Sequence, residues 1–151
     1  MAISARTKYN QIWKSFLSGD FVLCLSNEIL EEYEEVIARN VNPKIAGIVI
    51  YTILTRNNVE RLDPHFHFHL IQQDEDDNKF VDCAIVSNAK CIVSEDRHFE
   101  ILKTIDFPKV DILGIDEFVN TLLWISFFLY LLSIFFFPTF ALKFRTMQRD
   151  K

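Results

Sequence analysis

Apolar residues recur along the chain at two spacings, which predict helices alternating with short strands. Helical spacing or helix-capping signals predict six helices: Lys8–Leu17, Ser26 or Asn27 to Asn40, Pro43–Arg56, about Asp76–Asn88, Phe99–Thr104 and one capped by Asp116. Compact apolar runs predict three buried strands: Phe21–Leu25, Cys91–Ser94 and Val110–Ile115. This alternation indicates an α/β fold with a mostly parallel sheet covered by helices on both sides.

The helix predicted at about Asp76–Asn88 begins in a cluster of acidic residues, Asp74–Asp77. On a helical wheel, Asp77 lies on the same stripe as the apolar Val81 and Ala84. A carboxylate at the head of a buried stripe costs free energy unless it is compensated. The N–H groups of a helix N-terminus offer some compensation, and a divalent cation offers more. A helix cap and a metal ligand are therefore both open for Asp77.

Two further acids border apolar segments. Glu32 lies at the rim of the apolar arc of its predicted helix, as does Glu34 on the opposite side, and either could reach inward. Asp96 directly follows the strand Cys91–Ser94, at the end where open parallel sheets bind ligands, and Ser94 could support it by a hydrogen bond. The alternatives are a solvated Glu32 and an Asp96 that serves a turn.

Composition narrows the class of protein. The chain has 151 residues, a formal net charge of −5 and no long run of Lys or Arg, which argues against a broad basic face for nucleic acid. A nuclease that meets a phosphodiester through metal ions remains compatible with this charge. The three cysteines, an odd number in apolar runs, are predicted to be free thiols in a reducing compartment, which favours the cytoplasm.

The C-terminal segment differs from the rest. Residues 1–120 are expected to form one domain, and residues 121–151 an apolar tail. No charged residue occurs from Leu122 to Leu142, a length that can span a bilayer, and four basic residues follow. The positive-inside rule would then place the C-terminus in the cytoplasm and export the preceding domain. Non-native read-through sequence, membrane association through residues 122–142 and helical packing or oligomer contact are the alternatives considered for the tail.

The chain contains four histidines, three of them close together in the sequence. Val59–Leu70 is predicted to be extended or irregular, and as a strand it would place His65, His67 and His69 on one face. Phe66 and Phe68 would then face the core. Such histidines either ligate zinc or nickel or are ordinary surface residues. His98 follows Asp96 by two residues and is expected near the rim of its site.

From about Ser4 to Val119 the sequence resembles a PIN domain. It is most similar to the toxin components of bacterial toxin–antitoxin systems related to the VapC-type ribonucleases. Three stretches carry the resemblance in order and spacing: LSNEILEEYEEVIAR, DEDDNKFVDCAIVSNAKCIVSEDRHF and FPKVDILGIDEF. The resemblance implies a PIN-like (Rossmann-like) sheet and a nuclease that depends on Mg²⁺ or Mn²⁺ and cleaves single-stranded RNA.

The resemblance also implies roles for individual residues and partners. Glu32, Asp77 and Asp96 match the catalytic acids that hold metal in the family. Asp74, Asp76 and Ser94 would support them, the two acids by adding outer charge or holding water. The implied partners are single-stranded RNA, a cognate antitoxin protein and a second copy of the chain in a homodimer.

One departure from the family leaves three hypotheses. PIN domains begin with an apolar strand that ends in Asp-Thr-Asn and supplies a further metal ligand, whereas this chain begins MAISARTKYNQIW. The first strand and its Asp are therefore expected to be missing. The hypotheses are a PIN-type ribonuclease, a catalytically inactive remnant that binds RNA or an antitoxin, and a membrane-associated acidic domain.

Overall fold

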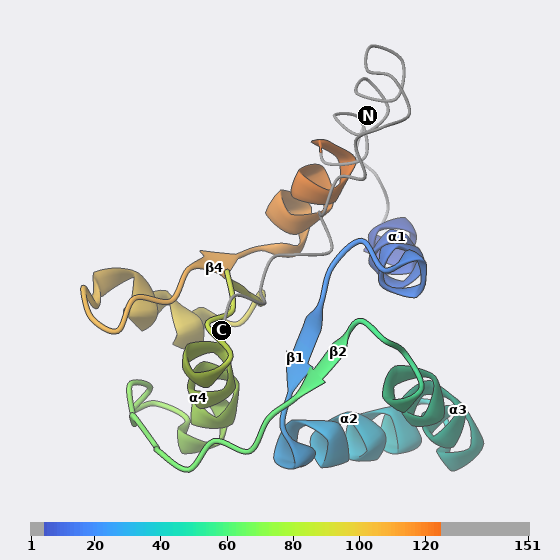
Figure 1. Cartoon of the computed structure of the whole chain (residues 1–151), viewed down its shortest axis with the longest axis horizontal. Helices are drawn as coiled ribbons and strands as arrows, with labels where there is room; N and C mark the ends of the chain where they lie inside the picture. Colours follow the sequence, from blue (N-terminus) through green and yellow to red (C-terminus); the bar gives the residue numbers. More distant parts are fainter. Residues whose placement is uncertain (1–4, 125–151) are drawn as a thin grey trace. The chain divides into compact units, whose positions relative to one another are not determined.

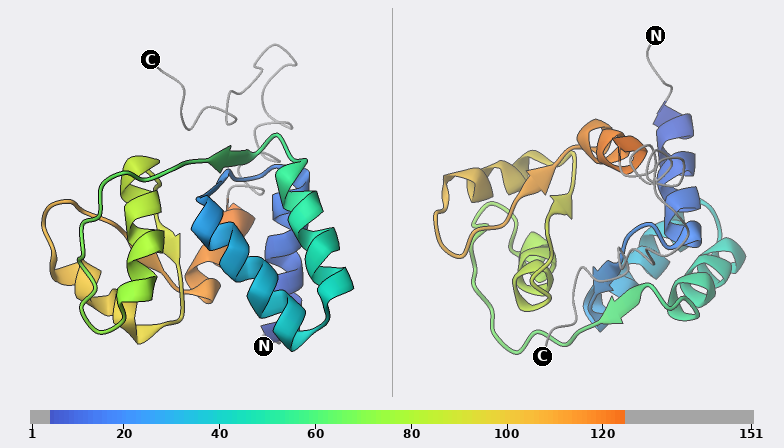
Figure 2. Two further views of the ribbon diagram at one scale, coloured as in Figure 1. Left: turned by 90° about the horizontal axis from the view of Figure 1, so that it is seen from below. Right: turned by 45° about the horizontal axis from the view of Figure 1, so that its top comes forward.

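The computed structural model describes residues 5–124 of the chain, which fall into two compact units. One unit is Val22–Gly114. The other combines Met1–Phe21 with Ile115–Lys151, of which residues 5–21 and 115–124 are described. Figures 1 and 2 show the elements of both units. Each unit is described here by itself.

The unit formed from both ends of the chain is held by aromatic contacts. Helix α1 (Ala5–Ser18) confirms the predicted first helix, and residues 115–124 form a second helix. The ring of Phe21 lies between Phe16 and Phe118, with centroid distances of 6.1 and 5.2 Å. Asp116, predicted as a cap, lies in the first turn of the second helix and forms an ion pair with Lys8. These contacts join the two segments of this unit.

The predicted tail lies almost wholly outside the described residues, which end at Trp124. Within residues 5–124, no helix has both the length and the apolar composition needed to cross a membrane. The tail's origin and its membrane contact therefore stay predictions.

The second unit contains the remaining elements in the predicted order, with an additional strand, β2, in the segment that was predicted to be extended or irregular. They are β1 (Leu23–Leu25), α2 (Asn27–Asn40), α3 (Pro43–Leu54), β2 (Val59–Arg61), η1 (Glu75–Asp77), α4 (Asn78–Val86), β3 (Ile92–Val93), η2 (Arg97–Thr104) and β4 (Ile112–Leu113). Two predicted helices differ in detail. The acidic cluster forms a separate 3₁₀ turn, η1, before α4, and the helix predicted at Phe99–Thr104 is a 3₁₀ helix that begins at Arg97.

Local signals in the sequence account for the starts of α2 and α3. The Ser26 hydroxyl accepts a hydrogen bond from the Ile29 N–H at 3.3 Å, and the Asn42 side chain accepts one from the Ile45 N–H at 2.9 Å. Each side chain thereby satisfies an N–H group that the first helical turn leaves unpaired. Pro43 occupies the first turn of α3, where a missing N–H costs nothing. α2 and α3 lie side by side (Figures 1 and 2).

The strands form two parallel pairs. β1 pairs with β2, with Leu23 opposite Val59, and β3 pairs with β4, with Ile92 opposite Ile112. Both ladders are parallel, as predicted, and they form two separate two-stranded sheets. α4 contacts both β1 and β3, so one helix covers both sheets. The structure is an α/β fold, as predicted.

The core lies between α4 and η2. α4 contributes Val81 and Ala84, both buried, which confirms the stripe seen on the helical wheel. Ile71 comes from the connection before η1, while Phe99 and Leu102 come from η2. This packing fixes η2 beside the N-terminal half of α4, and the residue that precedes η2 is Asp96.

The cysteines are free thiols, as predicted. Cys24, Cys83 and Cys91 are free, and Cys83 is buried. Burial raises the pKa of each thiol, that of Cys83 to about 12, and an uncharged thiol is unreactive at neutral pH.

The connection from β2 to η1 has no helix or strand between residues 62 and 74. It runs past α4 (Figure 1) and is tied to that helix by two buried polar side chains one turn apart, Asn78 and Asp82. The Asn78 amide bonds both the N–H and the C=O of Ile71, at 2.9 and 2.7 Å. The prediction that Phe66 faces the core is wrong. Because this segment is not a strand, Phe66 is 66% exposed.

Candidate metal site

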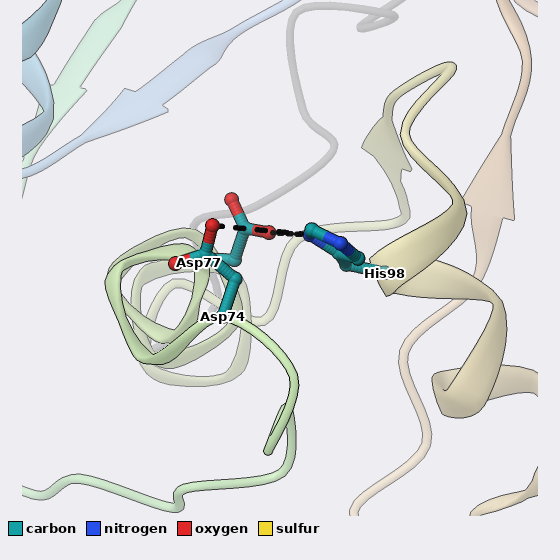
Figure 3. A group of neighbouring side chains, drawn as sticks. All are labelled: Asp74, Asp77 and His98. Carbon is teal, nitrogen blue, oxygen red and sulfur yellow. Dashed lines mark hydrogen bonds and ion pairs between the residues drawn. The ribbon is translucent and has the colours of Figure 1, made fainter.

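Asp77 stands at the N-cap position of α4 but makes no capping hydrogen bond. Its carboxylate instead lies across from the imidazole of His98, with Asp77 Oδ2 3.1 Å from His98 Nδ1 (Figure 3). The side chain of Asp77 is only 18% exposed. The Asp77 carboxylate therefore belongs to a side-chain cluster and does not cap the N-terminus of α4.

Two further carboxylates face the same imidazole nitrogen. Asp74 Oδ2 lies 3.9 Å and Asp96 Oδ1 lies 3.5 Å from His98 Nδ1. Three carboxylates from two segments, the turn before α4 and the residue after β3, thus surround one atom. The folding of η2 against α4 brings these segments together.

Local hydrogen bonds position these carboxylates. Asp74 Oδ1 accepts a bond from the Asp76 N–H at 3.1 Å and so begins η1. Asp96 Oδ1 accepts a bond from the His98 N–H at 2.9 Å and so begins η2. Ser94 supports this turn, since its hydroxyl accepts a bond from the Asp96 N–H at 3.0 Å. Asp96 thus serves a turn through Oδ1, the same oxygen that lies 3.5 Å from His98 Nδ1.

The environment raises the pKa of Asp77. Burial is the largest cause, and the negative charges of Asp74 and Asp96 add to it. The hydrogen bond and the charge of His98 act in the opposite direction without cancelling the increase. A cation at this position would relieve both the burial cost and the repulsion between carboxylates.

The donor set fits a divalent cation. Asp74, Asp77 and His98 each offer one ligand atom, and these atoms lie within 4.8 Å of one another. Carboxylate oxygens suit Mg²⁺ and Mn²⁺, and an imidazole nitrogen is a better ligand for Mn²⁺ than for Mg²⁺. His98, which the sequence placed only at the rim, lies at the centre of this cluster. The signal for His98 in the sequence was its position two residues after Asp96, in the Asp-Arg-His stretch that follows a strand.

Glu32 lies in α2, engaged with a different residue. Its Oε2 is 2.8 Å from Lys79 Nζ, on the first turn of α4. This oxygen is buried and has no partner of regular hydrogen-bond geometry among the described residues. The contact is therefore an ion pair that leaves acceptor capacity on this one buried oxygen, while the Glu32 side chain as a whole is 37% exposed. A buried oxygen of this kind fits a cation ligand.

Lys79 is surrounded by acids. Burial would lower its pKa, but the carboxylate of Glu32, with added charge from Asp76 and Glu28, more than offsets this, and the pKa is raised. Lys79 therefore remains charged and holds Glu32. Asp76 is exposed and belongs to the surroundings of Lys79, whereas Asp74 and Asp77 belong to those of His98.

The predicted site residues thus fall into two groups. Asp74, Asp77 and Asp96 come together at His98, with Ser94 behind Asp96. Glu32 and Asp76 come together at Lys79. Because Lys79 and Asp77 stand two residues apart on the chain, both groups lie at the N-terminal end of α4.

Comparison with known proteins identifies the family of the chain. The family model described as PIN domain matches residues 2–98, more than half of the chain. No curated protein and no solved structure matches the chain. PIN domains are in general nucleases that use divalent metal ions, and the acidic cluster beside His98 is a group able to hold one. On the family model's match and the parallel α/β fold, the chain belongs to the PIN domain family.

Proposed function

We propose that this protein is a PIN-type endoribonuclease that cleaves single-stranded RNA with Mg²⁺ or Mn²⁺ and acts as the toxin of a toxin–antitoxin system. One observation carries the nuclease part of the proposal. Three carboxylates converge on one nitrogen of His98, at 3.1, 3.5 and 3.9 Å. Such convergence is unfavourable for the carboxylates alone and favourable around a cation.

The residues are proposed to act in three roles. Asp77 and Asp96 would hold the metal, with Asp74 beside them. The ion would supply a nucleophilic water and stabilise charge on the scissile phosphate. His98 Nδ1, 3.1 Å from Asp77 Oδ2, would hold the Asp77 carboxylate in place. Glu32 would contribute its buried Oε2 from the side of α2, while Lys79 fixes that carboxylate and limits the negative charge around it.

The choice of RNA and the toxin role rest on the sequence resemblance. The stretches around Glu32, Asp77 and Asp96 resemble those of VapC-type ribonucleases. The net charge of −5 also favours a substrate gripped mainly through metal ions over one held by a basic face. A cognate antitoxin and a homodimer are part of this proposal on the same ground.

The test is cleavage of a mixed pool of single-stranded RNA in the presence of Mn²⁺. We expect cleavage by the wild-type protein and loss of at least about 100-fold in rate for Asp77→Asn, since metal positioning supplies several kcal/mol to such reactions. Glu75→Gln is the matched control. Glu75 is an exposed acid in the same turn, and it is not part of the group formed by Asp74, Asp77 and His98.

The outcomes separate the hypotheses. Equal rates for wild type and Asp77→Asn would overturn the proposed site. No cleavage by the wild type, together with RNA retention in a filter-binding assay, would identify a PIN domain that binds without cutting. Cleavage of single-stranded DNA in preference to RNA would reject the proposed substrate and leave the metal site intact.

A further inference from the structure

A second polar cluster lies on α4, one turn beyond Asn78, and centres on a buried carboxylate. Asp82 is 2% exposed. Its Oδ1 accepts a hydrogen bond from the Phe68 N–H at 3.0 Å, and its Oδ2 lies 2.9 Å from His67 Nδ1. Neither Asp82 nor His67 takes part in the acidic cluster at His98.

The buried carboxylate determines what His67 can do. Because a carboxylate is a hydrogen-bond acceptor, it favours the tautomer in which Nδ1 of His67 donates the hydrogen bond, which leaves Nε2 as the ligand atom. The ring is also held in one orientation, while 57% of the side chain remains exposed. A histidine whose Nδ1–H is bound by a carboxylate is the usual form of a metal-ligating histidine.

A second imidazole stands next to it. The ring centroids of His67 and His69 are 6.2 Å apart. His69 adopts a left-handed backbone conformation, with φ of 51°, which is uncommon for residues other than glycine. Two imidazoles bound to one tetrahedral zinc would have their ring centroids about 5 Å apart, since each Zn–N bond is about 2.0–2.1 Å. Rotation of the exposed His69 ring covers the difference.

The surroundings favour a cation. His67 and His69 line a pocket of about 400 Å³ together with Asp82 and other acidic side chains, among them Glu28 and Asp76. The one lysine of the pocket lining, Lys79, is paired with Glu32. A phosphate group would therefore meet net negative charge there, whereas a metal ion would meet attractive charge and two imidazole ligands.

We propose that His67 and His69 form a second metal site, which takes a divalent transition metal of the zinc, nickel or cobalt type, with Asp82 orienting His67. Imidazole ligands suit these ions, whereas Mg²⁺ takes oxygen ligands. Water molecules complete the coordination, because among residues 5–124 no third His, Cys, Asp or Glu offers a ligand atom within 4.8 Å of both histidines. The site is independent of the proposed nuclease function, because none of its ligands belongs to the cluster at His98.

The experiment uses the full chain with Asp77→Asn, which removes the cluster at His98 as a competing site. Co²⁺ is titrated and followed by its visible absorption spectrum, and Zn²⁺ binding is measured by calorimetry. We expect one bound ion per chain. In the same background, His69→Gln should weaken binding at least about tenfold, a loss of the size seen when the shell of a metal site is disturbed.

His65→Gln is the matched control, because His65 is exposed on the same segment and does not line the pocket. It should change the affinity by less than about twofold. His69→Gln is the decisive variant, since His67→Gln would also disturb a bond to the buried Asp82. A Co²⁺ spectrum that is unchanged by His69→Gln, or equal losses for His65→Gln and His69→Gln, would overturn the proposal. Saturable binding lost only with His69 supports it whether or not the chain cleaves RNA.

Discussion

At the scale of single residues, the acids gathered at the N-terminal end of α4 have different partners. Asp77 faces His98, and Glu32 faces Lys79. Asp77 bears a cost from burial and from neighbouring negative charge, whereas Glu32 is compensated by a lysine. A functional site explains the cost at Asp77, because raised carboxyl pKa values of this origin cluster where cations or protons are bound.

Substitutions of Glu32 and of Lys79 test whether Glu32 is a metal ligand or only one partner of a structural ion pair. If Glu32 holds metal, Glu32→Gln should lower the cleavage rate at least about tenfold, while Lys79→Met should lower it less, since Lys79 only positions the carboxylate. Rates are measured at saturating Mn²⁺. Glu35→Gln, an exposed acid on the same helix, is the control. Equal, small effects of Glu32→Gln and Lys79→Met would show that Glu32 has only a structural role.

The raised pKa of Asp77 predicts a pH-dependent stability without metal. The folded state binds the proton of Asp77 more tightly than the unfolded state, so this residue lowers the free energy of unfolding as pH rises above the ordinary carboxyl range. Asp77→Asn should therefore stabilise the metal-free protein at neutral pH by up to about 1 kcal/mol. The gain should disappear as the pH falls below that range. Urea unfolding in EDTA at several pH values measures it, and a destabilised variant at neutral pH would contradict the argument.

At the scale of elements, α4 organises the unit because each of its faces contacts a different part of it. Val81 and Ala84 pack in the core, while Asn78 and Asp82 hold the connection from β2, and Asp77 points to η2. The 3₁₀ turn η1 begins with the acidic cluster, so the helix starts later than periodicity alone predicted. The connection matters to the site because it ends at Asp74.

Asn78 should therefore contribute strongly to stability. Asn78→Ala would leave the N–H and C=O of buried Ile71 without partners and should cost about 2–4 kcal/mol, since each unpaired buried group costs about 1–3 kcal/mol. Chemical unfolding measures this loss. Asn57→Ala, at an exposed turn, should stay within about 0.5 kcal/mol of wild type. A loss at Asn78 no larger than that at Asn57 would show that the connection is held by other contacts.

At the scale of the molecule, the candidate metal site joins two segments of the Val22–Gly114 unit, the one before α4 and the one after β3. Ion binding should then stabilise the folded state as a whole. At a Mn²⁺ concentration of 100 times the Kd, the gain should be about 2.7 kcal/mol in the free energy of unfolding. Asp77→Asn should abolish most of this gain. A gain of the same size in that variant would place Mn²⁺ elsewhere on the chain.

Most helices and strands of this protein, and two of its converging acids, could be predicted from the sequence alone, because the sequence signals for them are local. Apolar spacing and helix-start signals predicted α1 to α4, with Ser26 or Asn27 expected to cap α2 and Pro43 expected to begin α3. The strand end before Asp96 and the buried stripe below Asp77 indicated two of the converging acids. These features depend on neighbours within one turn or one strand, so the sequence determines them.

Only the tertiary structure decided which side chains meet. Asp77 and His98 stand 21 residues apart, and nothing in their local patterns predicts a contact of 3.1 Å. The pairing of Glu32 with Lys79 and of Asp82 with His67 was likewise not predicted, since each joins separate segments. Such contacts follow from the packing of η2, α2 and the β2 connection against α4. Burial and charge neutralisation are properties of that packing, and they decide which of several similar acids becomes a site.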